Sequence, residues 1–210
     1  FPKWAGQCGE CGVWNTLVET IVESGAAAPP SGRTGWTGQQ AQLKTLAEVS
    51  IEELPRFSTA SGELDRVLGG GLVDGSVVLI GGDPGIGKST ILLQTLCQMA
   101  TRMPALYVTG EESQQQVAMR ARRLGLPQDQ LKVMTETCIE SIIATAKLEK
   151  PKVMVIDSIQ TIFTEQLQSA PGGVSQVRES AALLVRYAKS SGTAIFLVGH
   201  VTKEGALAGP

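Results

Sequence analysis

Residues 82–90 have the composition and spacing of a phosphate-binding loop. The glycines of a GxxxxGK[ST] pattern let backbone N–H groups converge on phosphate oxygens, and the helix that follows points its positive end at the same anion. Lys88 would supply a cation for the β- and γ-phosphates, and the hydroxyl of Ser89 would ligate a bridging Mg²⁺. A glycine-rich turn before a helix is often only architectural, but the complete pattern between an apolar strand and a helix favours binding of a nucleoside triphosphate such as ATP. The nucleotide-binding residues expected on this basis are Gly82, Asp83, Pro84, Gly85, Ile86, Gly87, Lys88, Ser89 and Thr90.

A second part of the same site follows a later apolar segment. Asp157 comes directly after residues 153–156, which are apolar and strand-like. A carboxylate in this position is typical of the second Mg²⁺-organising element of phosphate-loop ATPases, although it is also common as a turn or a helix cap. Ligands of an open parallel sheet bind outside the carboxyl ends of its strands. We therefore expect Ser89 and Asp157 to share one Mg²⁺ ion.

Hydrolysis also requires a group that activates water. Glu111 and Glu112 follow the strand-like residues 105–109, at the sheet edge where the phosphates would lie. Acidic residues also suit the first turn of a helix, so we expect Glu111 to be the catalytic base, together with Lys88, and Glu112 to begin the helix. His200, the only histidine, follows the strand-like residues 194–198 and is either an ordinary polar residue or a sensor of the γ-phosphate.

The elements that must position these residues alternate along the chain. Apolar strands that alternate with helical patterns predict an α/β fold with a mainly parallel sheet between helices. Residues 1–22 form a small cysteine-containing segment, residues 23–42 are rich in small residues and proline, which is typical of a flexible linker, and residues 43–210 are globular in composition. We expect strands over residues 77–80, 105–109, 131–134, 153–156 and 194–198, and helices over residues 61–68, 89–101, 113–124, 139–148 and 176–188.

Length and charge limit the alternatives. The chain has 210 residues and a net charge of −2, so diffuse positive charge cannot attract nucleic acid or an anionic membrane. The longest apolar stretches are strand-sized, and no signal peptide is visible, which predicts a cytoplasmic protein with no membrane partner. The chain lacks an initiator methionine and ends in a glycine-rich segment after an apolar strand, so we expect it to be a fragment.

Residues 64–76, which lead into the phosphate-binding loop, resemble the RecA-like ATPase core. Further motifs resemble the RadA (Sms) family of bacterial DNA-repair proteins. This resemblance implies a DNA-dependent ATPase that binds single-stranded DNA, promotes branch migration of recombination intermediates and assembles as a hexameric ring. It also puts Glu111 at the family's water-activating glutamate, and His200 at the strand end where RecA has a phosphate-sensing glutamine. The motifs that carry the resemblance are residues 1–8, 11–17, 107–113, 157–161 and 199–205.

The cysteines fit this family only in part. Its members begin with a four-cysteine zinc ribbon, and only the second pair of that ribbon, Cys8 and Cys11, is present in the sequence. A structural zinc ion requires four ligands, so this half site would hold zinc only in the complete protein. A redox CxxC is the alternative, but such motifs begin a helix after a strand rather than precede a linker. Cys97 and Cys138 lie in apolar helical patterns and are expected in the core.

The surface that would bind DNA is weakly encoded. By the same resemblance, the loops over residues 165–177 and 201–210 would face single-stranded or branched DNA, with Arg178 and Lys203 as the nearby cations. The alternative is that these loops are ordinary solvated surface. The family's Lys-Asn-Arg-Phe-Gly motif and its Lon-protease-like domain would lie beyond residue 210, and a recombinase is a further possible partner. Two other functions stay open: a regulatory ATPase of the clock-protein type, and a phosphate-loop phosphotransferase that acts on a small molecule.

Overall fold

The computed structural model describes residue 45 and residues 55–200, so the expectations for Cys8, Cys11, the linker and Lys203 fall outside the described part of the chain. The expected alternation of strands and helices is confirmed over residues 55–200, and a short antiparallel pair, β1 with β2, precedes it. In chain order the elements are β1 (Arg56–Phe57), α1 (Gly62–Val67), β2 (Leu72–Val73), β3 (Val77–Gly82), α2 (Lys88–Ala100), β4 (Ala105–Thr109), α3 (Gln114–Arg123), β5 (Lys132–Thr135), α4 (Ile139–Glu149), β6 (Val153–Asp157), a 3₁₀ helix (Ile159–Thr161), α5 (Val174–Ser191) and β7 (Ala194–His200).

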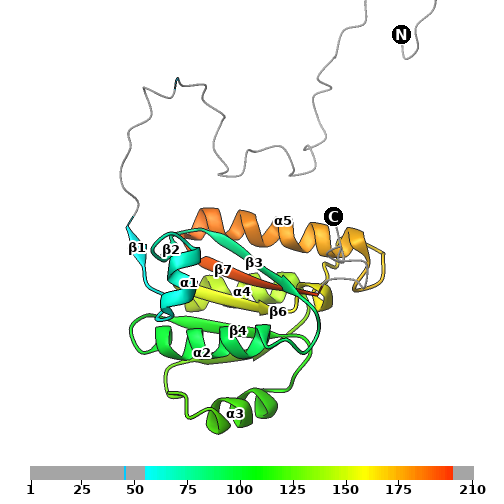
Figure 1. Ribbon diagram of the computed structural model, residues 1–210. Coiled ribbons are helices and arrows are strands. Elements are labelled where there is room, and N and C mark those ends of the chain that lie inside the picture. The colour runs from blue at the N-terminus through cyan, green and yellow to red at the C-terminus, as the bar shows by residue number, and fades with distance from the viewer. Residues whose placement is uncertain (1–44, 46–54, 201–210) are drawn as a thin grey trace, which may run out of the picture. The chain divides into compact units, whose positions relative to one another are not determined.

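Five of the strands form one parallel sheet in the order β3-β7-β6-β4-β5. Helices α2 and α3 cover one face of this sheet, and α4 and α5 cover the other (Figure 1). Parallel sheets need cover on both faces because their strands are apolar on both sides, and every residue of β4 and β6 is indeed buried. The expected α/β class, with a parallel sheet between helices, is therefore confirmed for this part of the chain.

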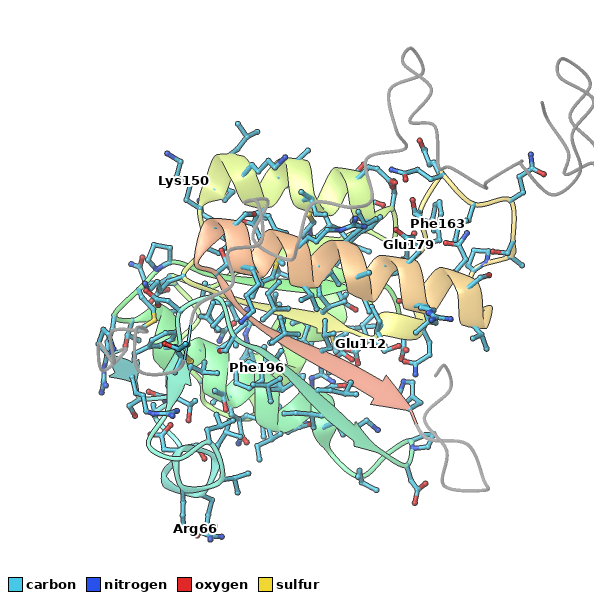
Figure 2. All side chains as sticks on the ribbon, turned by 90° about the horizontal axis from the view of Figure 1, so that it is seen from above. Arg66, Glu112, Lys150, Phe163, Glu179 and Phe196 are labelled. Carbon is cyan, nitrogen blue, oxygen red and sulfur yellow. The ribbon has the colours of Figure 1, made fainter. Side chains whose placement is uncertain are left out.

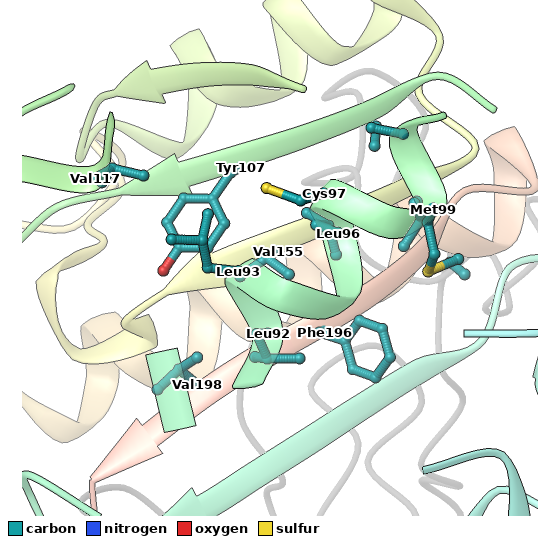
Figure 3. Packing of buried hydrophobic residues seen from close by; sticks show 14 of the residues in the cluster. Leu92, Leu93, Leu96, Cys97, Met99, Tyr107, Val117, Val155, Phe196 and Val198 are labelled. Carbon is teal, nitrogen blue, oxygen red and sulfur yellow. The ribbon is translucent and has the colours of Figure 1, made fainter. Parts of the chain in front are cut away.

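The core divides into two apolar clusters because successive side chains of a strand point to opposite faces of the sheet. In β4, Tyr107 packs in the cluster on the α2 side, whereas Leu106 and Val108 pack in the cluster on the α4 and α5 side. Figure 3 shows Tyr107 beside Leu93 of α2 in the first cluster. Each fully buried leucine contributes about 1.5–3 kcal/mol, and the two clusters hold the helices against the strands that carry the polar residues described below.

The ends of the helices follow from local chemistry. Helix α3 begins with a capping box, in which the Ser113 hydroxyl accepts a hydrogen bond from the backbone N–H of Gln116 and the Gln116 side chain accepts one from the N–H of Ser113. Helix α5 ends at Ser191 and is capped by Gly192, whose φ of 77° is a left-handed conformation that glycine adopts readily. In Figure 2, Lys150 and Phe163 lie at opposite ends of the layer formed by α4 and α5.

Candidate functional site

The predicted phosphate-binding loop connects β3 to α2. Gly85 and Gly87 have φ values of 82° and 97°, which explains the need for glycine at these two positions. Helix α2 begins at Lys88, and the loop residues 83–87 are exposed. The Lys88 amino group folds back onto the loop and donates hydrogen bonds to the backbone oxygens of Gly82 at 2.7 Å and Asp83 at 2.8 Å. An ammonium group has three N–H donors, so Lys88 can bind its own loop and still offer one donor to an anion.

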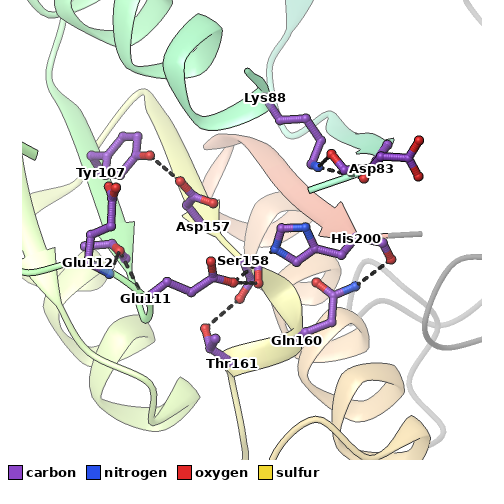
Figure 4. A network of polar contacts seen from close by, with 12 residues as sticks. Asp83, Lys88, Tyr107, Glu111, Glu112, Asp157, Ser158, Gln160, Thr161 and His200 are labelled. Carbon is purple, nitrogen blue, oxygen red and sulfur yellow. Dashed lines mark hydrogen bonds and ion pairs between the residues drawn. The ribbon is translucent and has the colours of Figure 1, made fainter. Parts of the chain in front are cut away.

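The strand register brings the other predicted site residues to the same edge of the sheet. Gly82 of β3 pairs with His200 of β7, and Thr109 of β4 pairs with Asp157 of β6. Because all these strands are parallel, their carboxyl ends and the segments that follow them meet at one edge. The phosphate-binding loop, His200, Asp157 and Glu111 therefore come from four strand ends that lie next to one another (Figure 4).

Glu111 is the centre of a polar network at this edge. The Ser158 hydroxyl donates a hydrogen bond to Glu111 Oε1 at 2.5 Å, and His200 Nε2 lies 3.1 Å from the same oxygen (Figure 4). The amide of Gln160 donates to the backbone oxygen of His200 at 3.2 Å. A side chain at Gly110 would overlap Thr161 in the 3₁₀ helix, so glycine is required for this close approach of β4 and the segment after β6. One carboxylate oxygen of Glu111 thus has two partners, and Oε2 has none among residues 55–200.

Glu112 has different surroundings. Both of its carboxylate oxygens bind the guanidinium of Arg120, at 3.1 Å and 2.5 Å, so the pair is bidentate. The side chain of Arg120 is 14% exposed, whereas Arg122 and Arg123 on the same helix are exposed. The two neighbouring glutamates therefore have different partners. Glu112 binds Arg120, whereas Glu111 points into the network at the strand ends (Figure 4).

Asp157 is almost completely buried, at 4% exposure, and its Oδ2 accepts a hydrogen bond from the hydroxyl of Tyr107. Burial of Tyr107 and the negative charge of Asp157 both raise the pKa of the tyrosine above its ordinary value, so the hydroxyl keeps its proton and acts as the donor. Neither Tyr107 nor Ser158 is among the residues expected at this site. The available signal was a hydroxyl within the apolar strand β4 for Tyr107, and a hydroxyl directly after Asp157 at the end of β6 for Ser158. A buried hydroxyl needs a hydrogen-bond partner.

Two open pockets adjoin the phosphate-binding loop, and Thr90 lines both. The first, of about 420 Å³, lies between the loop and the start of α2 and includes Ile86 and Ile91. The second, of about 670 Å³, lies between α2 and α3 and includes Met119 and Arg123. Both volumes fall in the range of small-molecule sites, about 300–1,000 Å³.

The predicted DNA-facing residues are less well defined. Arg178 is exposed on α5, whereas Lys203 lies outside the described residues. Helix α5 begins at Val174, two residues before the expected start, so the last part of the expected loop 165–177 is helical. Gln176 is only 1% exposed, and its side chain binds backbone groups of the preceding loop, which include the N–H of Thr164 at 2.8 Å and the oxygen of Ser169 at 2.9 Å.

Metal clusters and membrane-spanning helices are both absent from residues 55–200. No group of three or more histidine, cysteine, aspartate or glutamate side chains in this part of the chain could hold a metal ion. This does not conflict with a Mg²⁺ site at Ser89 and Asp157, because Mg²⁺ is usually held by one or two carboxylates, substrate phosphates and water. No helix within the same residues is both long enough and apolar enough to cross a membrane.

Known proteins resemble the chain in sequence and in fold. A model of the AAA domain matches residues 46–206. The chain is 84% identical over 210 residues to the DNA repair protein RadA of Pseudomonas aeruginosa, and 57% identical over 216 residues to that of Escherichia coli. Each match covers 100% of this chain and 46% of the relative, so the chain spans about half the length of these relatives. The resemblance to the RadA family expected from the sequence motifs is confirmed.

A solved structure shares the fold. The crystal structure of a KaiC-like protein from the hyperthermophilic archaeon Pyrococcus horikoshii OT3 superimposes with a TM-score of 0.60 and 20% sequence identity, covering 73% of this chain and 74% of that one. At this identity the likeness concerns the fold alone.

Proposed function

The chain belongs to the AAA-domain family, and we propose that it binds ATP with Mg²⁺ and hydrolyses it in a DNA-dependent reaction of recombinational DNA repair. The observation that carries this proposal is the meeting of a complete phosphate-binding loop, Asp157 and the Glu111 network at one edge of the sheet. Each of these groups suits one part of phosphoryl transfer: anion binding, metal binding and activation of water.

ATP binding would use the loop between β3 and α2. The backbone N–H groups of the loop and the first turn of α2 would bind the phosphates, and Lys88 would bind the β- and γ-phosphates with an amino group that already lies against the loop. The nucleoside would lie in one of the two pockets lined by Thr90. The hydroxyl of Ser89 and the carboxylate of Asp157 are hard oxygen donors that fit Mg²⁺. When bound, Mg²⁺ neutralises charge on the phosphates.

Hydrolysis would use Glu111 as the general base. Its Oε1 is held by Ser158 and His200, so Oε2 is the oxygen that can accept a proton from water. Glu112 is the weaker candidate because the bidentate pair with Arg120 occupies both of its oxygens. His200 lies between Glu111 and β3, the strand that leads into the phosphate-binding loop. An imidazole in this place could sense whether the γ-phosphate is present.

The DNA-related part of the proposal rests on the relatives. The similarity to proteins named DNA repair protein RadA covers the whole chain, including residues 1–42, and this favours a DNA-repair ATPase. We propose that the complete protein binds single-stranded and branched DNA, promotes branch migration and assembles as a homo-hexamer, with a recombinase as a possible partner. The fold itself does not separate this function from a regulatory ATPase of the clock-protein type, since a KaiC-like protein has the same fold.

An assay of ATP hydrolysis tests the proposal directly. On the complete protein, single-stranded DNA should stimulate release of phosphate from ATP when no small-molecule acceptor is present. Glu111→Gln should still bind ATP but hydrolyse it about 10²–10⁴-fold more slowly, because the amide cannot accept the proton. Glu112→Gln is the matched control and should retain most of the activity. Hydrolysis that requires a small acceptor, or that does not respond to DNA, would favour the other two functions.

A further inference from the structure

The side chain of Tyr107 reaches Asp157 across two neighbouring strands. The register pairs Tyr107 with Val155 and Thr109 with Asp157, so Tyr107 starts two residues behind Asp157 on the adjacent strand, a distance of about 6.6 Å along the strand. Alternation puts both side chains on the same face of the sheet. A long side chain such as tyrosine can span this distance and still pack its ring in the core beside α2 (Figure 3).

The ring and the hydroxyl of Tyr107 have separate roles. Tyr107 is 0% exposed, and phenylalanine would fill the same volume in the core. A buried hydroxyl is costly unless it has a hydrogen-bond partner, and the partner here is a carboxylate at the strand ends of the predicted ATP site. Among residues 55–200, no other side chain donates a hydrogen bond to Asp157.

We propose that Tyr107 is a positioning residue for Mg²⁺: its hydroxyl binds Oδ2 of Asp157 and leaves Oδ1 as the oxygen that serves the metal. This inference rests on the proposed function, because it assumes that Asp157 belongs to the Mg²⁺ site. A carboxylate with no such partner could rotate about its terminal bond, so that neither oxygen would be held in a fixed direction toward the metal. Partners of metal ligands typically contribute 10–100-fold in metal affinity, so the effect of removing the hydroxyl should be large enough to measure.

The test is Tyr107→Phe, with binding of a non-hydrolysable ATP analogue measured by calorimetry at increasing Mg²⁺ and in EDTA. We expect the Mg²⁺ concentration for half-maximal enhancement of binding to rise by about 10–100-fold, while the affinity in EDTA stays close to that of the wild type. Tyr187→Phe is the matched control. Tyr187 is the other tyrosine of the chain and is also buried, but it packs on the opposite face of the sheet. Its hydroxyl lies 3.4 Å from the hydroxyl oxygen of Thr193.

The possible outcomes distinguish this inference from the proposed function. If Asp157→Ala leaves the Mg²⁺ dependence of binding unchanged, the Mg²⁺ site itself is wrongly assigned. If Asp157→Ala abolishes that dependence and Tyr107→Phe behaves like Tyr187→Phe, only the role of Tyr107 is refuted. If Tyr107→Phe does not fold, Tyr107→Phe with Asp157→Ala is compared with Asp157→Ala alone, because alanine has no oxygen to accept the hydrogen bond. Equal stability supports the pair, whereas a further loss shows that the hydroxyl acts elsewhere.

Discussion

Replacing Ser158 by alanine should slow ATP hydrolysis without weakening ATP binding. Ser158 is fully buried, and its hydroxyl donates to Glu111 Oε1 at 2.5 Å, while His200 Nε2 lies 3.1 Å from the same oxygen. Two partners on one oxygen hold the carboxylate in one orientation, so that Oε2 would face the attacking water in a fixed geometry. The substitution removes one of the two partners and changes neither the backbone nor the charge of the site.

The size of the effect follows from the exposure of the pair. A hydrogen bond to a charged group contributes about 1.5–3 kcal/mol, but the Glu111 side chain is 41% exposed, so water can replace part of this interaction. The lower value of about 1.5 kcal/mol corresponds to a decrease of about 10-fold in kcat. The contact between His200 and Glu111 is more exposed, and His200→Ala should decrease kcat by about 2–5-fold. His200→Gln keeps a donor of similar reach and should lose less activity than His200→Ala.

The assay is steady-state ATP hydrolysis by the complete protein at saturating single-stranded DNA, with kcat and KM determined separately. Ser158→Ala should decrease kcat and leave KM nearly unchanged, because Ser158 contacts Glu111 and none of the predicted phosphate-binding residues. Glu111→Gln gives the activity that remains without the base. If Glu111→Gln abolishes turnover but Ser158→Ala keeps the wild-type kcat, Ser158 does not orient the base, and the reasoning is refuted. An increase in KM at constant kcat would also refute it, since Ser158 would then act on binding.

Two further predictions concern the phosphate-binding loop and DNA. Lys88→Ala should weaken binding of Mg-ATP by about 10–100-fold in calorimetry because it removes a charged hydrogen-bond donor. Lys189→Ala, at the far end of α5, is the control and should bind Mg-ATP as the wild type does. Equal affinity of the wild type and folded Lys88→Ala contradicts the prediction. Arg178→Ala and Lys203→Ala should each weaken binding to all single-stranded sequences alike and decrease the salt slope by about 0.7 for each phosphate that is no longer bound, with basal ATP hydrolysis preserved. Arg186→Ala is the control, because the Arg186 side chain pairs with Glu179 on the same helix. If Arg178→Ala and Lys203→Ala both leave DNA binding unchanged, the segments 165–177 and 201–210 are excluded as the DNA surface.

Some features of this protein follow from short stretches of sequence. The phosphate-binding loop needs glycine at positions 85 and 87 because the backbone there has positive φ, and Lys88 follows directly as the first residue of α2. Asp157 was predictable in the same way, since it ends an apolar strand of a parallel sheet. Apolar runs and helical periodicity also predicted the order and type of the elements in the main sheet, with errors of a few residues at their ends.

The partners of the proposed catalytic groups could not be predicted in this way, because they depend on which strands lie side by side. His200 lies next to Glu111, 89 residues earlier, only because β7 is inserted between β3 and β6. Tyr107 meets Asp157, 50 residues later, only because β4 pairs with β6 in one particular register. The sequence by itself thus determined the loop, the elements and the residues at the strand ends, since these depend on local backbone conformation and local hydrophobicity. Only the tertiary structure decided which of the two glutamates has a free oxygen and which side chains hold it, because strand order and register arise from packing between segments that are far apart in the chain.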